Sequence, residues 1–314
     1  MPSTPKIVPP AFITAANHVR RVANTLDRYL DPHRDEQPGS IAAGDLSHVE
    51  YNEGWGRATL EVTLEGPRLA VLIADHLHAV SALTRDPKVV YALSSVIRPA
   101  LSTCGTLYWL YEPATDVHER VRRRSNVWLV SLAEQRNIAG RAHLGLGSQI
   151  DVMRASAERT GFDFHDPRSP KDRLEKPCYL GTPVPREQAL IEAVANASGN
   201  LGGAGSFMHR MTSAVVHGQA HGLLAFMDTG GKEPSSNGTN LVPTHLSLSM
   251  YALLVGSLLD VVNAAVRRLC GYHAWDLRAW EQVTVPAFAD FRDWIRLPRE
   301  TGEHLATSDY GPSA

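Results

Sequence analysis

The sequence predicts an all-α protein, a single bundle-like domain of about eight helices, some of them kinked. Apolar residues recur with the period of an α-helix along most of the chain, and only one short segment alternates like a β-strand. Hydrophobic residues make up 43% of the chain and charged residues 20%, which is typical of a globular protein. We expect the helical domain to cover residues 11–296, between a disordered N-terminus (1–10) and a disordered tail (297–314).

The expected elements follow from the apolar periodicity and from the residues that interrupt it. Residues 32–56 are rich in Pro, Gly and Asp and predict a loop. Residues 58–66 (ATLEVTLEG) alternate and are the strand candidate, although they can also lead into the helix that follows. Pro87 after Asp86 predicts the start of a helix, and Pro99 predicts a kink within it. The expected helices cover residues 11–31, 66–84, 87–111, 115–140, 148–160, 185–197, 203–227, 243–270 and 276–294.

Three segments of the second half need a separate interpretation. Residues 161–184 and 229–242 lack periodicity and predict long connections, the second one rich in Gly and Ser. The segment 250–266 (MYALLVGSLLDVVNAAV) is strongly apolar but short for a membrane span, and it contains the polar residues Asp260 and Asn263. We therefore expect a central buried helix of the bundle and no membrane association.

Charge and cysteine usage exclude several classes of function. The formal net charge is -2 at pH 7, so a nucleic-acid role requires a local basic patch, for which the run from Arg120 to Arg124 is a candidate. Cys104, Cys178 and Cys270 are widely spaced, which argues against a disulfide framework and against a cysteine zinc site.

The N-terminal segment and the ratio of arginine to lysine indicate the cellular compartment and the type of organism. The N-terminus lacks the basic and apolar regions of a signal peptide, and arginine far outnumbers lysine, as in proteins from GC-rich bacterial genomes. The chain contains no Rossmann fingerprint and no phosphate-binding glycine loop followed by lysine. We expect a cytoplasmic bacterial protein without a cofactor.

The expected helix over 203–227 carries the most function-like pattern. Its polar residues fall within roughly 80° of one another on a helical wheel, beside an apolar face that includes Phe207 and Met211. A histidine can transfer a proton near neutral pH, and an arginine can hold a phosphate group. The pattern thus suggests acid–base chemistry on a phosphodiester. The residues of this polar stripe are Ser206, Arg210, Ser213, His217 and His221.

Arg210, the six residues MTSAVV and then His217 form a pattern that resembles the R-x4-6-H motif of the HEPN superfamily, a group of helical bundle proteins. The stretch HRMTSAVVHG also resembles the R-x-x-S-x-x-x-H-G segment of uncharacterised bacterial helical proteins. The resemblance implies a homodimer that acts on RNA as a metal-independent endoribonuclease of a toxin or defence system. In that role His217 is the acid/base, Arg210 holds the phosphate, and Ser213 gives polar support.

A second Arg–His pair and a pair of histidines add further candidates. Arg136 and His143 have the same spacing, and Asn137 follows Arg136, as a polar residue often does in HEPN ribonucleases. His217 and His221 are spaced to share a metal ion, but HGQAH lacks the glutamate of the HExxH motif. We therefore predict no metal centre, and assign His221, Arg136 and His143 to ligand binding.

Asp260 is the remaining candidate, because an unpaired carboxylate is costly to bury in so apolar a helix. We expect it to pair with Arg98 or Arg136, or to contribute to a binding site.

Two alternatives to the ribonuclease stay open at this point. The chain can be a non-catalytic interaction or small-molecule-binding protein, or an enzyme that acts on a small metabolite through His217 and His221, with or without a metal.

Overall fold

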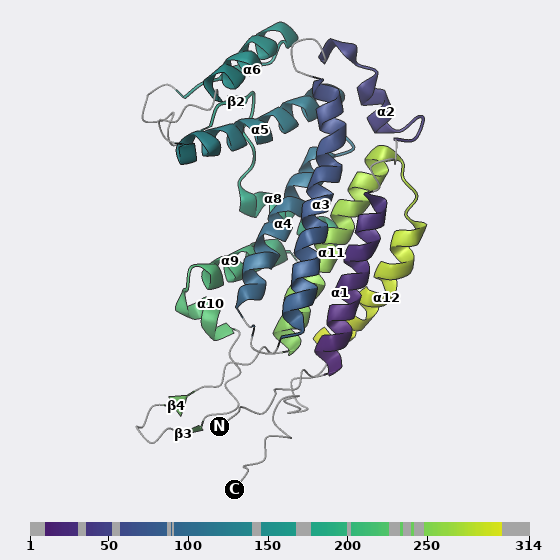
Figure 1. Cartoon of the computed structure of the whole chain (residues 1–314), viewed down its shortest axis with the longest axis vertical. Coiled ribbons are helices and arrows are strands. Elements are labelled where there is room, and N and C mark those ends of the chain that lie inside the picture. Colours follow the sequence, from purple (N-terminus) through teal and green to yellow (C-terminus); the bar gives the residue numbers. More distant parts are fainter. Residues whose placement is uncertain are drawn as a thin grey trace.

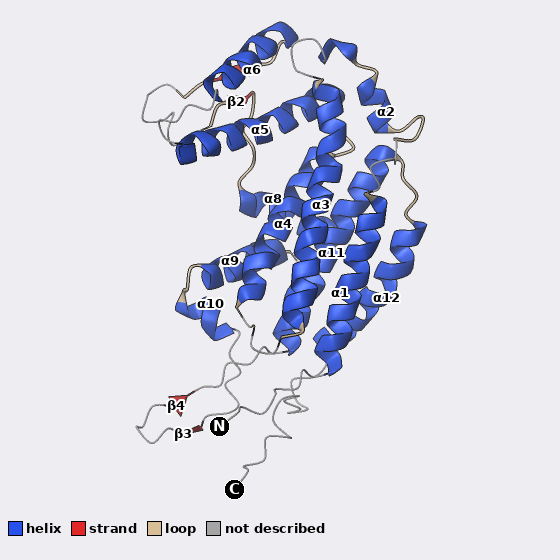
Figure 2. Ribbon diagram, viewed as in Figure 1, coloured by secondary structure: helices blue, strands red, loops and turns tan. Residues whose placement is uncertain are grey.

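The computed structural model confirms the all-α fold (Figures 1 and 2). It describes residues 10–30, 36–51, 57–86, 89, 91–139, 146–167, 177–199, 202–225, 233–234, 240–241 and 248–296. Eleven α-helices lie in these residues. The strands are two-residue antiparallel pairs, β1 (Phe164–His165) with β2 (Tyr179–Leu180) and β3 (Glu233–Pro234) with β4 (Asn240–Leu241). The termini expected to be disordered lie outside the described residues, apart from Pro10.

The helices follow the expected order with shifted ends. They are α1 (Pro10–Tyr29), α2 (Ile41–Leu46), α3 (Ala58–Thr84), α4 (Ala92–Leu110), α5 (Val117–Ala139), α6 (Leu146–Thr160), α8 (Glu187–Ala197), α9 (Ala204–Val216), α10 (Ala220–Ala225), α11 (Leu248–His273) and α12 (Arg278–Arg296). A short 3-10 helix covers Val49–Tyr51.

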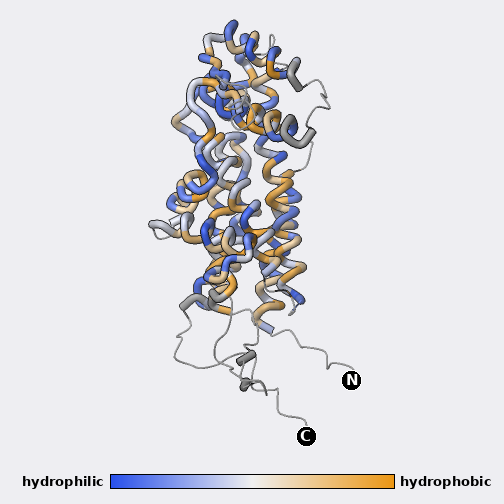
Figure 3. The backbone as a smooth tube through the Cα atoms, turned by 90° about the vertical axis from the view of Figure 1, so that its left-hand side faces the viewer, coloured by the Kyte–Doolittle hydropathy of each residue, from blue (hydrophilic) through white to orange (hydrophobic). Residues whose placement is uncertain are grey.

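The long helices α1, α3, α4, α11 and α12 lie side by side along the long axis of the molecule (Figure 1). Helix α5 lies across one end of this bundle next to α6, whereas α8 and α9 pack against α4. In the side view, hydrophobic and hydrophilic residues are interspersed along each helix of the bundle, as expected when one face of a helix is buried (Figure 3).

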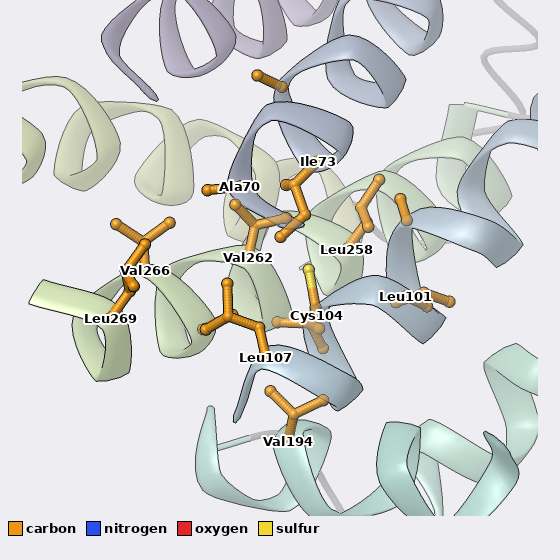
Figure 4. Packing of buried hydrophobic residues seen from close by; sticks show 14 of the residues in the cluster. Ala70, Ile73, Leu101, Cys104, Leu107, Val194, Leu258, Val262, Val266 and Leu269 are labelled. Atoms are coloured by element: carbon orange, nitrogen blue, oxygen red, sulfur yellow. The ribbon is translucent and has the colours of Figure 1, made fainter. Parts of the chain in front are cut away.

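Helix α11 is the central helix of the core, as its sequence predicts. Its Leu258 and Val262 are fully buried and pack with Ile73 of α3 and Cys104 of α4 (Figure 4). Met250–His273 is long and apolar enough to cross a membrane, but 67% of its most apolar window is buried inside the protein. That burial is typical of a core helix. All three cysteines are buried free thiols.

Three expectations about element boundaries are wrong. The strand option for 58–66 fails because these residues form the first turns of α3, where their β-branched residues Val62 and Thr63 are buried in the helical bundle. The loop over 32–56 contains α2, whose N-terminus is capped by Ser40. Helix α4 begins at Ala92, not at Pro87, which lies outside the described residues.

Pro67 lies inside α3, and a tyrosine hydroxyl is inserted into the helix one turn before it. Tyr111 donates to the Val62 carbonyl at 2.5 Å and accepts from the Gly66 N–H at 2.6 Å, which are the two groups that an uninterrupted helix would join directly. A proline ring crowds the preceding turn and opens such bonds. The buried Tyr111 hydroxyl satisfies both groups and fixes the end of α4 to α3.

A buried ion pair joins the short helix α2 to α5. The Arg120 guanidinium donates to the Asp45 carboxylate at 2.6 and 2.7 Å, and both side chains are 5% exposed or less. The Tyr272 hydroxyl of α11 donates to the same carboxylate at 2.9 Å. The ring of Tyr272 also packs against that of Tyr111 at a tilt of 37°, with ring centroids 4.4 Å apart. Asp45, Arg120, Tyr272 and Tyr111 therefore form one cluster that joins α2, α5, α11 and the end of α4.

His273, next to Tyr272, is 2% exposed, and its ring is stacked on Trp275 at 4.2 Å between centroids. Neither ring nitrogen has a hydrogen bond of normal geometry among the described residues. Burial lowers the pKa of His273 to about 4, an effect that the backbone of Thr63 partly offsets. The folded protein therefore holds this imidazole neutral.

Replacing Asp45 by alanine is expected to lower the free energy of unfolding by roughly 3–5 kcal/mol, because it leaves the Arg120 charge buried without a partner. Urea unfolding followed by circular dichroism measures this change. The matched control is Glu281→Ala in the exposed pair with Arg267, for which we expect a loss below about 1 kcal/mol. Equal losses in the two variants would contradict the importance of the buried pair.

The stability of the fold is expected to decrease as the pH falls from about 6.5 to about 4, because the unfolded chain protonates His273 in this range and the folded chain does not. The contribution of this residue is about 3 kcal/mol at most. Urea unfolding across this range should show a shallower pH dependence for His273→Phe, which keeps an aromatic ring but cannot titrate. Parallel pH profiles of the variant and the wild type would show that the prediction is wrong.

Candidate functional site

The helix expected over 203–227 is interrupted, and this correction separates its residues. Helix α9 ends at Val216, and His217 is its C-cap residue. Gly218 has a φ of 65°, a left-handed conformation that favours glycine, and the Gln219 N–H bonds to the Ala214 carbonyl at 2.8 Å. His221 therefore belongs to α10 and does not continue the stripe of α9.

The buried face of α9 also differs from the expected one. Its buried residues include Gly205, Met208, Thr212 and Val215, whereas Phe207 is 42% exposed. The close contact with α8 explains why α9 is rotated about its axis relative to the expected orientation. A Cβ atom at Gly205 would lie only 2.6 Å from the Glu192 Cα. Only the residue without a side chain can face α8 at this point.

Helix α8 determines the position of α9 through a second contact. The Glu192 carboxylate accepts from the backbone N–H of Gly203 at 2.9 Å and of Ser206 at 2.6 Å, and thus caps the N-terminus of α9. Gln188 of α8 donates to the Ser206 hydroxyl at 3.1 Å. Helix α8 is itself close to α4, because a Cβ atom at Gly105 would lie 2.8 Å from the Leu190 carbonyl carbon.

The predicted catalytic residues Arg210, His217 and Ser213 do not share one environment. Arg210 and His217 are exposed, and neither has an ion-pair partner in the part of the chain that the structure describes. The Ser213 hydroxyl is buried, and no hydrogen-bond partner is described for it. Arg210 and His217 thus lie at the surface, whereas Ser213 is on the side of α9 that is partly covered.

An open groove runs between α4, α8 and α9, with a volume of about 410 Å³. Most of its lining comes from α4, at positions that repeat every three or four residues and therefore share one face of the helix. Pro99 has no N–H to donate to the carbonyl of Ser95, which lines the same groove. The lining residues are Ser95, Arg98, Pro99, Ser102, Thr103, Glu187 and Val216.

The groove contains a charged cluster, formed by the side chains of Arg98, Glu187 and His209 from three different helices. Arg98 of α4 donates to Glu187 of α8 through Nε at 3.4 Å and Nη2 at 3.0 Å. His209 of α9 places Nε2 3.5 Å from the same carboxylate. Burial alone raises the pKa of the Glu187 carboxyl, but the hydrogen bond and charge of Arg98, together with His209, outweigh it and hold the pKa below its ordinary value.

Several buried polar atoms on α4 and α9 have no hydrogen-bond partner among the residues that the structure describes. These atoms are the hydroxyls of Ser94 and Ser213 and the Nδ1 of His209. Of these residues only His209 belongs to the charged cluster, whereas Ser94 and Ser213 are not among the residues that line the groove. Unsatisfied buried groups are rare in folded proteins.

The expected ion pair between Asp260 and Arg98 is not formed. Arg98 pairs with Glu187 of α8 and not with Asp260. Burial raises the pKa of the Asp260 carboxyl, and only the charge of Arg292 partly opposes it. Asp260 is therefore not part of the groove.

The side chain of Arg136 and the whole of His143 lie outside the described residues.

The basic run of α5 is engaged in ion pairs and does not form a free basic patch. Arg120 binds Asp45, Arg122 binds Glu119, Arg123 binds both Glu119 and Glu112, and Arg124 binds Glu61 of α3. Each of the four guanidinium groups therefore has a carboxylate partner. In the described part of the chain, no group of three histidine, cysteine or acidic side chains is arranged to hold a metal ion.

Comparisons with known proteins add no assignment: no family model, curated protein or solved structure matches this chain.

Sequence reasoning missed Glu187 and His209, two of the three residues of the charged cluster. His209 directly precedes Arg210, and it faces α8 because the buried face of α9 differs from the one that the sequence predicts. Its place in the sequence next to Arg210 is the one feature that could have singled it out. Glu187 is the first residue of α8, where a carboxylate is usually explained by the helix dipole. Their partnership with Arg98 depends on helix packing that periodicity does not specify.

Proposed function

We propose that the protein binds a small polar molecule in the groove between α4, α8 and α9. The observation that carries this proposal is the Arg98–Glu187 ion pair in the wall of an open groove, with His209 Nε2 3.5 Å from the same carboxylate. Small-molecule sites combine a pocket of 300–1,000 Å³ with a few convergent polar groups, and a volume of about 410 Å³ is in this range.

The arrangement favours binding over a defined reaction. Arg98 and Glu187 hold each other in place, which orients their polar atoms but leaves no unpaired charge to act as a strong base. Pro99 and Val216 supply apolar contact surface, and Ser95, Ser102 and Thr103 supply hydroxyls. A ligand with one polar end and a small body matches these walls.

The test is a thermal-shift screen of the purified full chain against a panel of small metabolites. A ligand at 100 times its Kd stabilises by about 2.7 kcal/mol, which for a chain of this size corresponds to roughly 4 °C in Tm. Ser102→Trp fills the groove and should abolish the shift, whereas Thr14→Trp on the exposed surface of α1 should retain it. If the same molecules stabilise Ser102→Trp as much as the wild type, the groove is not the binding site.

A second candidate function, RNA cleavage, is favoured by the exposure of Arg210 and His217 on and next to α9. Seven residues correspond to two helical turns, or about 10 Å along the axis. Both side chains can therefore approach one phosphodiester, with His217 as acid/base and Arg210 as the phosphate holder. The exposed Phe207 on the same helix is suited to contact with a second copy, as the HEPN resemblance implies.

For this candidate, His217→Ala is expected to reduce cleavage of a mixed RNA substrate by about 10²–10⁴-fold, the usual contribution of a general acid or base. His48→Ala, which changes an exposed histidine of the distant N-terminal region, should cleave like the wild type. Gel-based cleavage assays on protein of known oligomeric state give the readout. Equal cleavage by wild type and His217→Ala, or none by the folded wild type, would remove ribonuclease activity from consideration.

A further inference from the structure

The Arg98 guanidinium uses only one of its two forked edges within the protein. Nε and Nη2 face the Glu187 carboxylate, at 3.4 and 3.0 Å. Among the described residues no acceptor is bound to Nη1, and this nitrogen is not among the buried atoms that lack a partner. Arginine presents five N–H donors, so the outer edge formed by Nη1 and Nη2 stays available in the groove.

Glu187, in contrast, has little capacity left for a ligand. Its Oε1 accepts from Arg98 Nε, and its Oε2 is approached by both Arg98 Nη2 and His209 Nε2. Arg98, together with His209, stabilises the ionised carboxylate, as the lowered pKa of Glu187 indicates. A cationic ligand would have to displace one of these two partners. The groove is therefore a donor site and not an acceptor site.

Two hydroxyls lie on the same face of α4 as Arg98. Ser95 is three residues before it and Ser102 four residues after it, one helical turn away on each side. The Thr103 hydroxyl, by comparison, already donates to the Pro99 carbonyl at 2.8 Å. Ser95 and Ser102 can thus donate to a group that is bound at the outer edge of Arg98.

We propose that the ligand of this groove carries an oxyanion, a carboxylate or a phosphate group, which the outer edge of Arg98 binds in a bidentate manner with help from Ser95 and Ser102. Planar forks of this kind match the geometry of carboxylate and phosphate oxygens. Glu187 acts as a positioning residue that holds the guanidinium in this orientation. The inference rests on the proposed binding function and specifies the chemistry of its ligand.

The test uses isothermal titration calorimetry of the full chain with two simple probes, inorganic phosphate and acetate. We expect saturable binding of at least one of them with a Kd on the order of 1 mM. Arg98→Lys keeps the positive charge but loses the fork, and it should weaken binding at least about tenfold. Arg20→Lys, at an exposed position on α1 away from the groove, is the matched control and should bind like the wild type.

The outcomes separate this inference from the proposed function. Tighter phosphate binding assigns the site to phosphate esters, and tighter acetate binding assigns it to carboxylates; either result supports the inference. If Arg98→Lys, verified as folded by circular dichroism, binds both probes like the wild type, or if the wild type binds neither, the oxyanion assignment is overturned. Neutral or cationic metabolites whose thermal shift is lost in Ser102→Trp would leave the groove as a binding site and overturn only its ligand class.

Discussion

The buried ion pair between Asp45 and Arg120 is the interaction on which the arrangement of the upper end of the bundle depends. It joins α2 to α5, and Tyr272 ties the same carboxylate to α11. Two charges removed from water are tolerated only when their hydrogen bonds are nearly complete, as they are here. Because α5 is held in this way, its Asn126 can bond to the backbone of Leu180, with distances of 2.6 and 3.0 Å. That contact anchors β2, from which the chain continues into α8 and Glu187.

The groove results from polar residues placed on helices that are otherwise packed tightly. Gly105 and Gly205 let α8 approach α4 and α9 at backbone distance, so the three helices meet closely at these points. Around Pro99 and Arg98 the three helices leave an open volume. A region that gives up packing lowers the stability of the fold, and proteins retain such regions mainly where they bind something.

Electrostatic pairing explains why so arginine-rich a chain has no free basic patch along α5. The guanidinium groups of α5 bind carboxylates of α2, α3 and α5 itself, and Arg98 binds α8. Arginine suits these positions because its planar fork satisfies two acceptors at once. Arg98 differs from the arginines of α5 in that it lines an open groove. Arg210, which is exposed, belongs to the separate outer surface of α9.

The sequence by itself determined the helical class, the order of the long helices and the core position of α11. These properties depend on local periodicity and on hydrophobic content, which can be read along the chain. The tertiary structure decided which face of α9 is buried, where that helix ends, and which acid binds Arg98. Arg98 and Glu187 are 89 residues apart, and their pairing depends on how closely α4, α8 and α9 approach at glycines. The site is therefore a product of packing between distant segments, which periodicity within one segment does not encode.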